Sequence, residues 1–179
     1  MKATGIVRRI DDLGRVVIPK EIRRTMRIRE GDPLEIFTNR DGEVIFKKYS
    51  PIGELSDFAG QICESLHKST DGVAAVCDRD SVIACAGVPK KELVDKRVSE
   101  GLSEIMDGRK LYTAAQGIEI PFIDGDEKLF ISVAAPILAE GDVMGCVVYT
   151  ARSNAVPPSE VQVKLASTVA SFLGKQMEN

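Results

Sequence analysis

The sequence contains no tryptophan, and aromatic residues make up only 5% of its 179 positions. A hydrophobic core must therefore be built from valine, isoleucine, leucine and alanine. No apolar stretch approaches the ~18–20 residues that a membrane-spanning helix needs, so we expect no membrane contact. The first ten residues carry Lys2, Arg8 and Arg9 and lack the apolar segment of a secretion signal. We therefore expect a cytoplasmic globular protein.

Histidine and cysteine are also scarce, which argues against several chemistries. His67 is the only histidine, and the four cysteines form no C-x-x-C pair, so we expect no metal site. A Ser–His–Asp triad would depend on His67, which lies at the polar end of a helical stretch with no nucleophile motif nearby, and we expect it to face solvent. The four cysteines are Cys63, Cys77, Cys85 and Cys146. The last three lie among apolar residues, and we expect them to be buried as small hydrophobic side chains.

The two ends of the chain differ in charge. Residues 1–50 hold 12 Lys and Arg against 8 Asp and Glu, a net of +4. Residues 51–179 hold 12 basic and 19 acidic residues, a net of −7. This asymmetry indicates that the basic segment meets a polyanion and the acidic segment does not. An ordinary solvated surface is the alternative that charge alone leaves open.

The best boundary between domains falls at Lys47–Pro51. Before it the pattern is one of short strands and turns, and after it apolar residues recur at helical spacing. Ser50 suits a helix cap, and Pro51 suits the first helical position. We therefore divide the chain into residues 1–50 and residues 51–179.

The first domain predicts four short strands and one short helix. Asp41-Gly42 marks a hairpin, because both central positions of a type I′ turn need positive φ. A unit this small, without disulfide or metal, buries too little surface to be stable alone, so we expect a dimer. The expected strands are Gly5–Ile10, Arg15–Ile18, Leu34–Thr38 and Glu43–Lys48, with a turn at Asp11–Gly14 and a helix from Pro19 to about Met26.

The second domain predicts an α+β fold. Its last two strands are apolar on both sides and should be central in a sheet. Ser99 and Ser159 are positioned as helix caps, the latter in a capping box with Gln162. The expected strands are Gly72–Cys77, Val82–Ala86, Ile118–Phe122, Leu129–Leu138 and Val143–Thr150, and the expected helices begin at Pro51, Pro89, Ser99 and Ser159.

The first 50 residues closely resemble the swapped-hairpin DNA-binding domain of AbrB-like transition-state regulators. The resemblance implies an intertwined, β-barrel-like dimer, which agrees with the size argument. It rests on Thr4-Gly5-Ile6-Val7-Arg8, Leu13-Gly14-Arg15-Val16-Val17-Ile18-Pro19, Ile22-Arg23-Arg24 and Gly31-Asp32-Pro33-Leu34-Glu35-Ile36.

Residues 51–179 resemble a GAF-type sensory domain, an antiparallel sheet with flanking helices. The residues that carry this resemblance are Val133-Ala134-Ala135-Pro136-Ile137-Leu138 and Val143-Met144-Gly145-Cys146-Val147-Val148-Tyr149. It implies a pocket between the sheet and the crossover helices, at about Gly87–Gly117. The sequence leaves open whether that pocket binds an unidentified small-molecule effector or is filled by side chains, and we expect no cofactor.

The resemblance to AbrB-like regulators also implies which residues contact double-stranded DNA. The family's DNA-contacting arginines fall on Arg8, Arg15, Arg23 and Arg24, with Lys20 and Arg27 a turn to either side on the expected helix. Arginine suits this role because its guanidinium binds phosphate and the guanine edge with two hydrogen bonds. The sequence has no helix-turn-helix pattern, so recognition should depend on phosphate contacts and DNA shape. The resemblance implies the same, with A·T-rich promoter regions as the targets.

The two resemblances together imply a transcription regulator, activator and repressor, of a sporulation or developmental programme, and we expect it to be bound to the nucleoid in the cytoplasm. An antitoxin is the first alternative, but antitoxins usually end in a short disordered tail, whereas ~130 residues with periodic apolar pattern follow here. An enzyme is the second alternative, and Ser132, Asp124 and Glu119 are polar candidates without catalytic spacing. We expect no enzymatic activity.

The last helix has more apolar residues than one face can bury in its own subunit. One stripe contains Val161, Leu165, Val169 and Phe172, and a second contains Val163, Ala166, Ala170 and Leu173. The first helix of this domain offers Leu55, Phe58, Ile62 and Leu66 as a partner. We therefore expect these two helices to form a helical bundle across a two-fold axis, which converts the dimer into a tetramer. The alternative is that both stripes are buried within one subunit.

Overall fold

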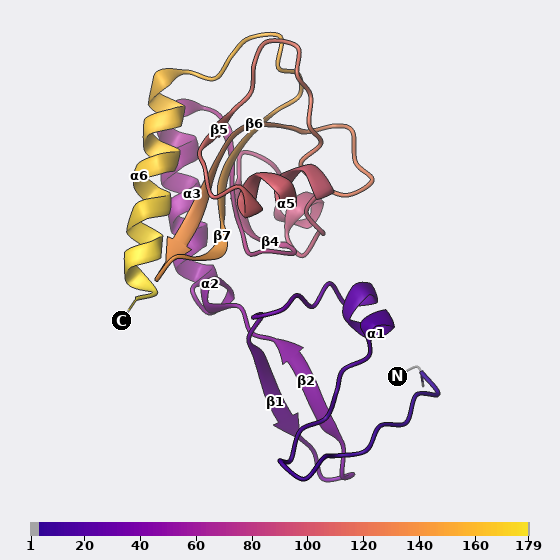
Figure 1. Cartoon of the computed structure of the whole chain (residues 1–179). Helices are drawn as coiled ribbons and strands as arrows, with labels where there is room; N and C mark the ends of the chain where they lie inside the picture. Colours follow the sequence, from indigo (N-terminus) through magenta and orange to yellow (C-terminus); the bar gives the residue numbers. More distant parts are fainter. Residues whose placement is uncertain (1–3, 179) are drawn as a thin grey trace. The chain divides into compact units, whose positions relative to one another are not determined.

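The structure is a computed structural model that describes residues 4–178 (Figure 1). It divides into two compact units, residues 1–49 and residues 50–179. The division lies one residue from the boundary that the sequence suggests. We describe each unit by itself.

Unit 1 consists of the short helix α1 (Lys20–Thr25) and the antiparallel hairpin of β1 (Leu34–Thr38) and β2 (Val44–Lys48). Pro19 precedes the first residue of α1, where a missing N–H costs no helical hydrogen bond. The hairpin turn differs from the expected type I′. The amide of Gly42 donates to the Asn39 carbonyl, and only Gly42 of the two expected residues has positive φ. This is the longer hairpin loop in which a glycine follows an ordinary turn.

The two strands expected at Gly5–Ile10 and Arg15–Ile18 are not strands in this single chain. A strand is defined by a hydrogen-bonded neighbour, and these segments share one backbone bond beside their turn, from the Asp11 amide to the Arg15 carbonyl. Their apolar side chains are exposed except for Ile18, which is half-buried, and Pro19 alone is buried among residues 4–49. The described part of unit 1 therefore has no hydrophobic core in one copy.

Unit 2 is built on a five-stranded antiparallel sheet in the order β4-β3-β7-β6-β5. The two long apolar strands β6 and β7 lie inside the sheet, as their sequences predict. The strands are β3 (Val73–Cys77), β4 (Val82–Ala86), β5 (Tyr112–Thr113), β6 (Phe130–Ala139) and β7 (Asp142–Ala151). The helices are α2 (Pro51–Glu54), α3 (Ser56–Thr70), α4 (Lys90–Leu93), α5 (Glu100–Asp107) and α6 (Glu160–Gln176).

Helices cover both faces of this sheet and create two cores. On one face α3 and α6 lie side by side (Figure 1), and Tyr149 of β7 is fully buried beneath them. The Tyr149 hydroxyl donates a hydrogen bond to the Leu66 carbonyl of α3, so its polar end is satisfied. On the other face, α4 and α5 enclose Leu102, Met106 and Phe122, all fully buried.

The expected helix caps are present in unit 2. Ser99 Oγ accepts a hydrogen bond from the Leu102 amide, and Ser159 forms a capping box with Gln162. These caps satisfy N–H groups that the first turn of a helix leaves without partners.

The strand expected at Ile118–Phe122 is wrong. This segment is irregular, and Ile118 is exposed. A buried side chain holds it in place: Asn154 donates from Nδ2 to the Ile118 carbonyl at 2.8 Å and to the Ile131 carbonyl of β6 at 3.0 Å. The apolar alternation that predicted a strand reflects the burial of Phe122 in the core, although the backbone of the segment follows a loop.

Two helical glycines test how tightly unit 2 is packed. A Cβ on Gly174 of α6 would overlap the Leu138 carbonyl oxygen of β6, whereas a Cβ on Gly60 of α3 would meet no other atom within 4 Å. We expect Gly174→Ala to destabilise unit 2 by about 2 kcal/mol, because the helix must move away from the sheet. Gly60→Ala, the matched control, should stabilise it by about 0.5–1 kcal/mol. Urea unfolding measures both, and a Gly174→Ala protein as stable as the parent would contradict this packing.

Candidate nucleic-acid interface

The turn that precedes Arg15 is organised by one carboxylate. Asp11 Oδ1 accepts hydrogen bonds from the backbone amides of Leu13 at 3.0 Å and Arg15 at 2.8 Å. Its other oxygen, Oδ2, accepts from Arg15 Nε at 2.8 Å. Gly14 completes the turn with φ of 76°, a conformation that glycine adopts without strain. A single side chain therefore fixes both the backbone and the guanidinium of Arg15.

These bonds also change the ionisation of Asp11. Hydrogen bonds from the Arg15 backbone and then from the Arg15 side chain lower the pKa of Asp11 below its ordinary value. Asp11 is therefore ionised at neutral pH. The Arg15 side chain remains 69% exposed while it is held, so its remaining N–H groups are available to another molecule.

Helix α1 presents three cations on one side. At 3.6 residues per turn, Lys20, Arg23 and Arg24 fall within about 100° of one another. All three are exposed. Arg23 Nε donates to the Ile18 carbonyl at 3.2 Å, which fixes the direction of that side chain at the start of the helix. Arg8 is exposed as well, on the segment before the turn.

Arg27 departs from the expected placement. It lies beyond the end of α1, has φ of 51°, and is half-buried. Its carbonyl accepts a hydrogen bond from Lys48 Nζ at 2.8 Å, and the same ammonium lies 3.4 Å from Asp32 Oδ2. The backbone of Arg27 is thus part of the joint between the helix and the hairpin. The helix ends too early for Arg27 to share a face with Arg24.

Sequence reasoning identified the exposed basic residues but missed the role of Asp11. The visible signal was an Asp at the first position of a tight turn that ends in Gly-Arg, where the side chain often bonds backbone two residues on. Asp11 was interpreted only as a turn residue, and its contact with the Arg15 side chain was not predicted.

The polar candidates for an enzyme do not form a set. Ser132 is buried in β6, whereas Asp124 and Glu119 lie on exposed loop positions. Glu119 accepts a hydrogen bond from Ser153 at 3.0 Å. A buried hydroxyl and exposed carboxylates do not provide a nucleophile with an adjacent base.

The cysteines and the histidine have structural roles. All four cysteines are buried, and burial raises the pKa of Cys63 to about 12 and the pKa of Cys77 well above its ordinary value. Such thiols hold their protons and are poor nucleophiles and metal ligands. His67 is half-buried rather than solvent-facing, and its Nδ1 lies 2.8 Å from the Gly72 carbonyl, which requires that Nδ1 carry the proton. Among residues 4–178, no group of His, Cys, Asp and Glu is arranged to hold a metal ion.

Two family models match the chain, one for each unit. The model described as stage V sporulation protein T C-terminal, transcription factor, matches residues 54–178. The model described as antidote-toxin recognition MazE, bacterial antitoxin, matches residues 7–53. No helix among the described residues is long and apolar enough to cross a membrane.

Similar proteins cover the whole chain. Stage V sporulation protein T of Bacillus subtilis is 51% identical over 179 residues, which is 99% of each chain. The transition state regulatory protein AbrB of the same organism is 56% identical over 63 residues, 32% of this chain and 65% of AbrB. The GAF domain of an Acinetobacter phosphoenolpyruvate-protein phosphotransferase has a TM-score of 0.56 at 12% identity, covering 73% of this chain and 84% of that one.

These findings define the class of the protein first: a transcription factor that joins an AbrB-like unit to a unit with the GAF fold. Within that class, the chain belongs to the family of stage V sporulation protein T. Both expected resemblances are confirmed. The antitoxin match ends at residue 53, whereas the similarity to the sporulation regulator spans the chain, which favours the regulator over the antitoxin.

Proposed function

We propose that the protein binds double-stranded DNA through unit 1 and regulates transcription of a sporulation programme as activator and repressor. The observation that carries this proposal is the pair of rigid, exposed cationic elements, Arg15 on its Asp11-organised turn and Lys20, Arg23 and Arg24 on α1. Guanidinium groups held on fixed backbone bind phosphate and base edges without a large loss of entropy.

The exposed apolar residues of unit 1 support a dimer at the DNA. Val7 is 88% exposed, Ile10 is 72% and Val17 is 69%, and they belong to the two segments that have no strand neighbour in one chain. A second copy that intertwines with the first would supply those neighbours and bury these side chains. The same symmetry would present each cationic element twice, as a palindromic or bent site requires.

Because α1 has only six residues, it reaches few bases in a major groove. We therefore propose that phosphate contacts and DNA shape dominate recognition, with a preference for A·T-rich promoter regions, whose narrow minor groove attracts arginine. We place this activity on the nucleoid in the cytoplasm, and we propose no enzymatic activity for the chain.

The salt dependence of binding tests this surface. Each phosphate contact contributes ~0.9 to the slope of log affinity against log salt, so losing Arg15 from both copies should reduce the slope by about 2. We expect Arg15→Ala and Arg24→Ala each to weaken binding of an A·T-rich duplex at least tenfold and to leave the dimer intact. Arg40→Ala, which removes an arginine of the hairpin loop, is the control. Unchanged affinity and slope for Arg15→Ala would disprove the assignment.

Asp11 gives a test in which electrostatics and geometry predict opposite signs. Removing a negative charge from a basic surface should by itself strengthen DNA binding. We expect Asp11→Ala to weaken binding several-fold instead, because Arg15 loses the hydrogen bonds that fix its backbone and guanidinium. Asp12→Ala removes the same charge from the next residue and should bind as tightly as the parent or tighter. Fluorescence anisotropy with duplex DNA measures both variants, and tighter binding by Asp11→Ala would refute the positioning role.

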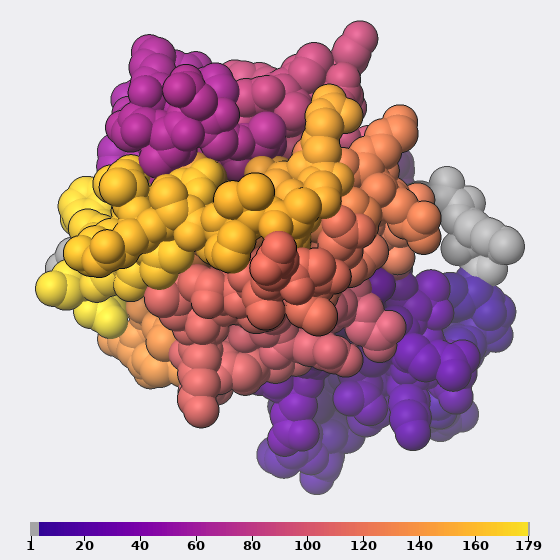
Figure 2. All heavy atoms as spheres, turned by 90° about the horizontal axis from the view of Figure 1, so that it is seen from above, coloured from indigo at the N-terminus to yellow at the C-terminus, as the bar shows by residue number. Residues whose placement is uncertain are grey.

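Unit 2 supports a second contact between copies. Val161 and Phe172 of α6 are exposed, Phe58 of α3 is 37% exposed, and the rings of Phe58 and Phe172 lie 6.1 Å apart. The second stripe of α6, with Ala166, Ala170 and Leu173, is buried in the same subunit. Of the first stripe, Val161 and Phe172 remain on the surface, whereas Leu165 and Val169 are half-buried against the core of their own subunit. In Figure 2, α6 (yellow) lies beside α3 (magenta). We propose that two such helix pairs associate as a four-helix bundle and make a tetramer.

The tetramer is tested by charge on this stripe. Phe58→Glu with Leu165→Glu should yield a dimer in light scattering, held through unit 1, because a desolvated carboxylate is costly in an apolar contact. Gln61→Glu with Ser167→Glu adds the same charges to the same two helices away from the stripe and should leave a tetramer. A folded Phe58→Glu and Leu165→Glu protein that remains tetrameric would place the contact elsewhere.

A small-molecule effector of the GAF-like unit remains a prediction. Leu102, Met106 and Phe122 fill the core between the sheet and α5, which supports oligomerisation as the main role of unit 2. Mass spectrometry of small molecules released from the purified tetramer would identify an effector if one is bound.

A further inference from the structure

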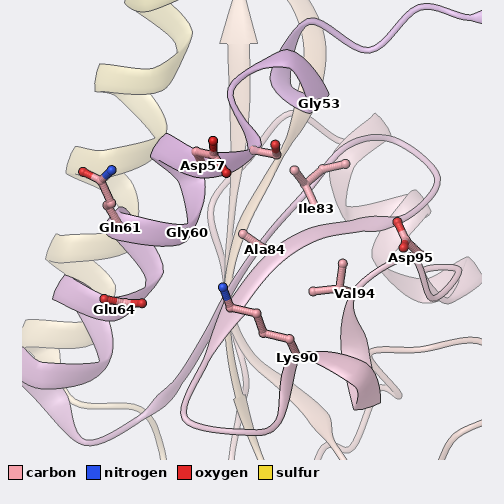
Figure 3. Close-up of a pocket in the computed structure, with 11 residues that line it drawn as sticks. Gly53, Asp57, Gly60, Gln61, Glu64, Ile83, Ala84, Lys90, Val94 and Asp95 are labelled. Carbon is pink, nitrogen blue, oxygen red and sulfur yellow. The ribbon is translucent and has the colours of Figure 1, made fainter.

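A groove runs along the edge of unit 2 between α3, β4 and α4, with a volume of about 460 Å³. Gly60 and Ala84 form its floor with little or no side chain, and Ile83 adds an apolar surface (Figure 3). Asp57 and Glu64 of α3 line one side. Asp95 and Lys90 line the other, from α4 and the residues that follow it.

This groove uses a face of α3 that no other contact in unit 2 requires. Ala59, Cys63 and Leu66 form the buried face of the helix. Phe58 lies about 100° from that face and contacts Phe172 of α6. The groove residues Asp57, Gly60 and Glu64 occupy the remaining third of the helix, on the side away from α6.

Gly60 is the feature that the single chain does not explain. It lies inside a 15-residue helix, beyond the first turn, where glycine weakens the helix relative to alanine. Glycines at close contacts in this unit have a steric reason, as Gly174 has against β6, but a Cβ on Gly60 would meet nothing within 4 Å. A residue without a side chain at this position is explained if the backbone of another molecule approaches α3 here.

The charges at the rim of the groove indicate what kind of molecule could bind there. Asp57, Glu64 and Asp95 supply three carboxylates against the single ammonium of Lys90, all beside an apolar floor. This excess of negative charge repels a nucleic acid and attracts lysine or arginine. An amphipathic segment fits both properties, with its apolar side against Ile83 and Ala84 and its basic side at the rim.

We propose that the α3–β4 groove binds a short amphipathic segment of a partner protein that carries several lysine or arginine residues. Its backbone passes over Gly60, and its cations pair with Asp57, Glu64 and Asp95. This contact goes beyond DNA binding and uses none of the residues assigned to it. It gives the regulator a place to meet another protein while unit 1 is bound to DNA.

The experiment uses the full chain and a fluorescent peptide of about 15 residues, composed of leucine, alanine, lysine and arginine, with leucine at i, i+3, i+4 and i+7. A second peptide has glutamate at every basic position. Anisotropy should show binding of the basic peptide and none of the acidic one. Gly60→Gln should weaken binding at least tenfold, because its side chain occupies the floor. Glutamine favours the helix and Cβ meets no atom there, so this variant should remain folded.

Charge reversal provides the second arm. Asp57→Lys with Glu64→Lys should also weaken binding at least tenfold. Glu104→Lys with Glu127→Lys makes the same change in net charge at exposed residues outside the groove and should bind within twofold of the parent. Equal binding by the parent and Gly60→Gln, or equal loss in both charge-reversed proteins, would overturn the proposal.

Two further readouts separate this groove from the contacts proposed above. Sedimentation of Gly60→Gln should give the same oligomer as the parent, and a change of oligomer would mean that a second copy of the chain occupies the groove, which also overturns the proposal. DNA affinity of Gly60→Gln should equal that of the parent. The peptide result therefore stands or fails independently of the proposed function.

Discussion

Residues 4–49 do not bury their own apolar side chains in a single chain, and the organisation of the protein depends on that constraint. Among residues 4–49 only Pro19 is buried, while Val7, Ile10 and Val17 are largely exposed. Each such side chain gains roughly 1.5–3 kcal/mol when it is fully removed from water. A second chain that supplies the missing strand neighbours offsets the entropy of ordering this segment, and it duplicates the cationic elements at the same time. Stability and DNA recognition in unit 1 thus have one origin.

The basic surface itself depends on an acidic residue. An exposed arginine on a flexible turn would lose much of its binding energy to ordering. Asp11 lowers this entropic cost by ordering the turn before DNA binds. Its two oxygens accept hydrogen bonds from the Arg15 amide, the Arg15 guanidinium and the Leu13 amide. The net charge of unit 1 therefore does not reveal the role of Asp11, whose negative charge positions the positive charge of Arg15.

Elements whose signals are local were predictable from the sequence. Strand β4 was expected with its observed bounds, and Ser99 and Ser159 cap helices as predicted, because a cap or a short apolar run is read within a few residues. Contacts between distant segments were not. The alternation at Ile118–Phe122 describes burial, but Asn154, more than thirty residues away, sets the backbone.

The same division applies to the sites. The exposed arginines were identified through the family resemblance. Arg27 was misplaced because α1 ends at Thr25 and Arg27 lies in the turn that follows, with φ of 51° and its carbonyl bound by Lys48. The α3–β4 groove could not be foreseen, because residues 57–64 of α3 and residues 83–95 form it and only the folding of the sheet brings these two segments together. Gly60 was its one local sign: a glycine in an otherwise regular helical pattern usually has a packing reason.

The opposite charges of the two units allow both kinds of contact to operate together. A polyanion is attracted to residues 1–50, with a net of +4, and repelled by residues 51–179, with a net of −7. A cationic segment of a partner has the reverse preference. Neither ligand competes for the surface of the other, and raising ionic strength weakens both. DNA binding by unit 1 alone does not require unit 2 to carry a net negative charge. If the groove binds a basic segment as proposed, a strongly acidic unit 2 would both keep DNA on unit 1 and attract that partner to α3.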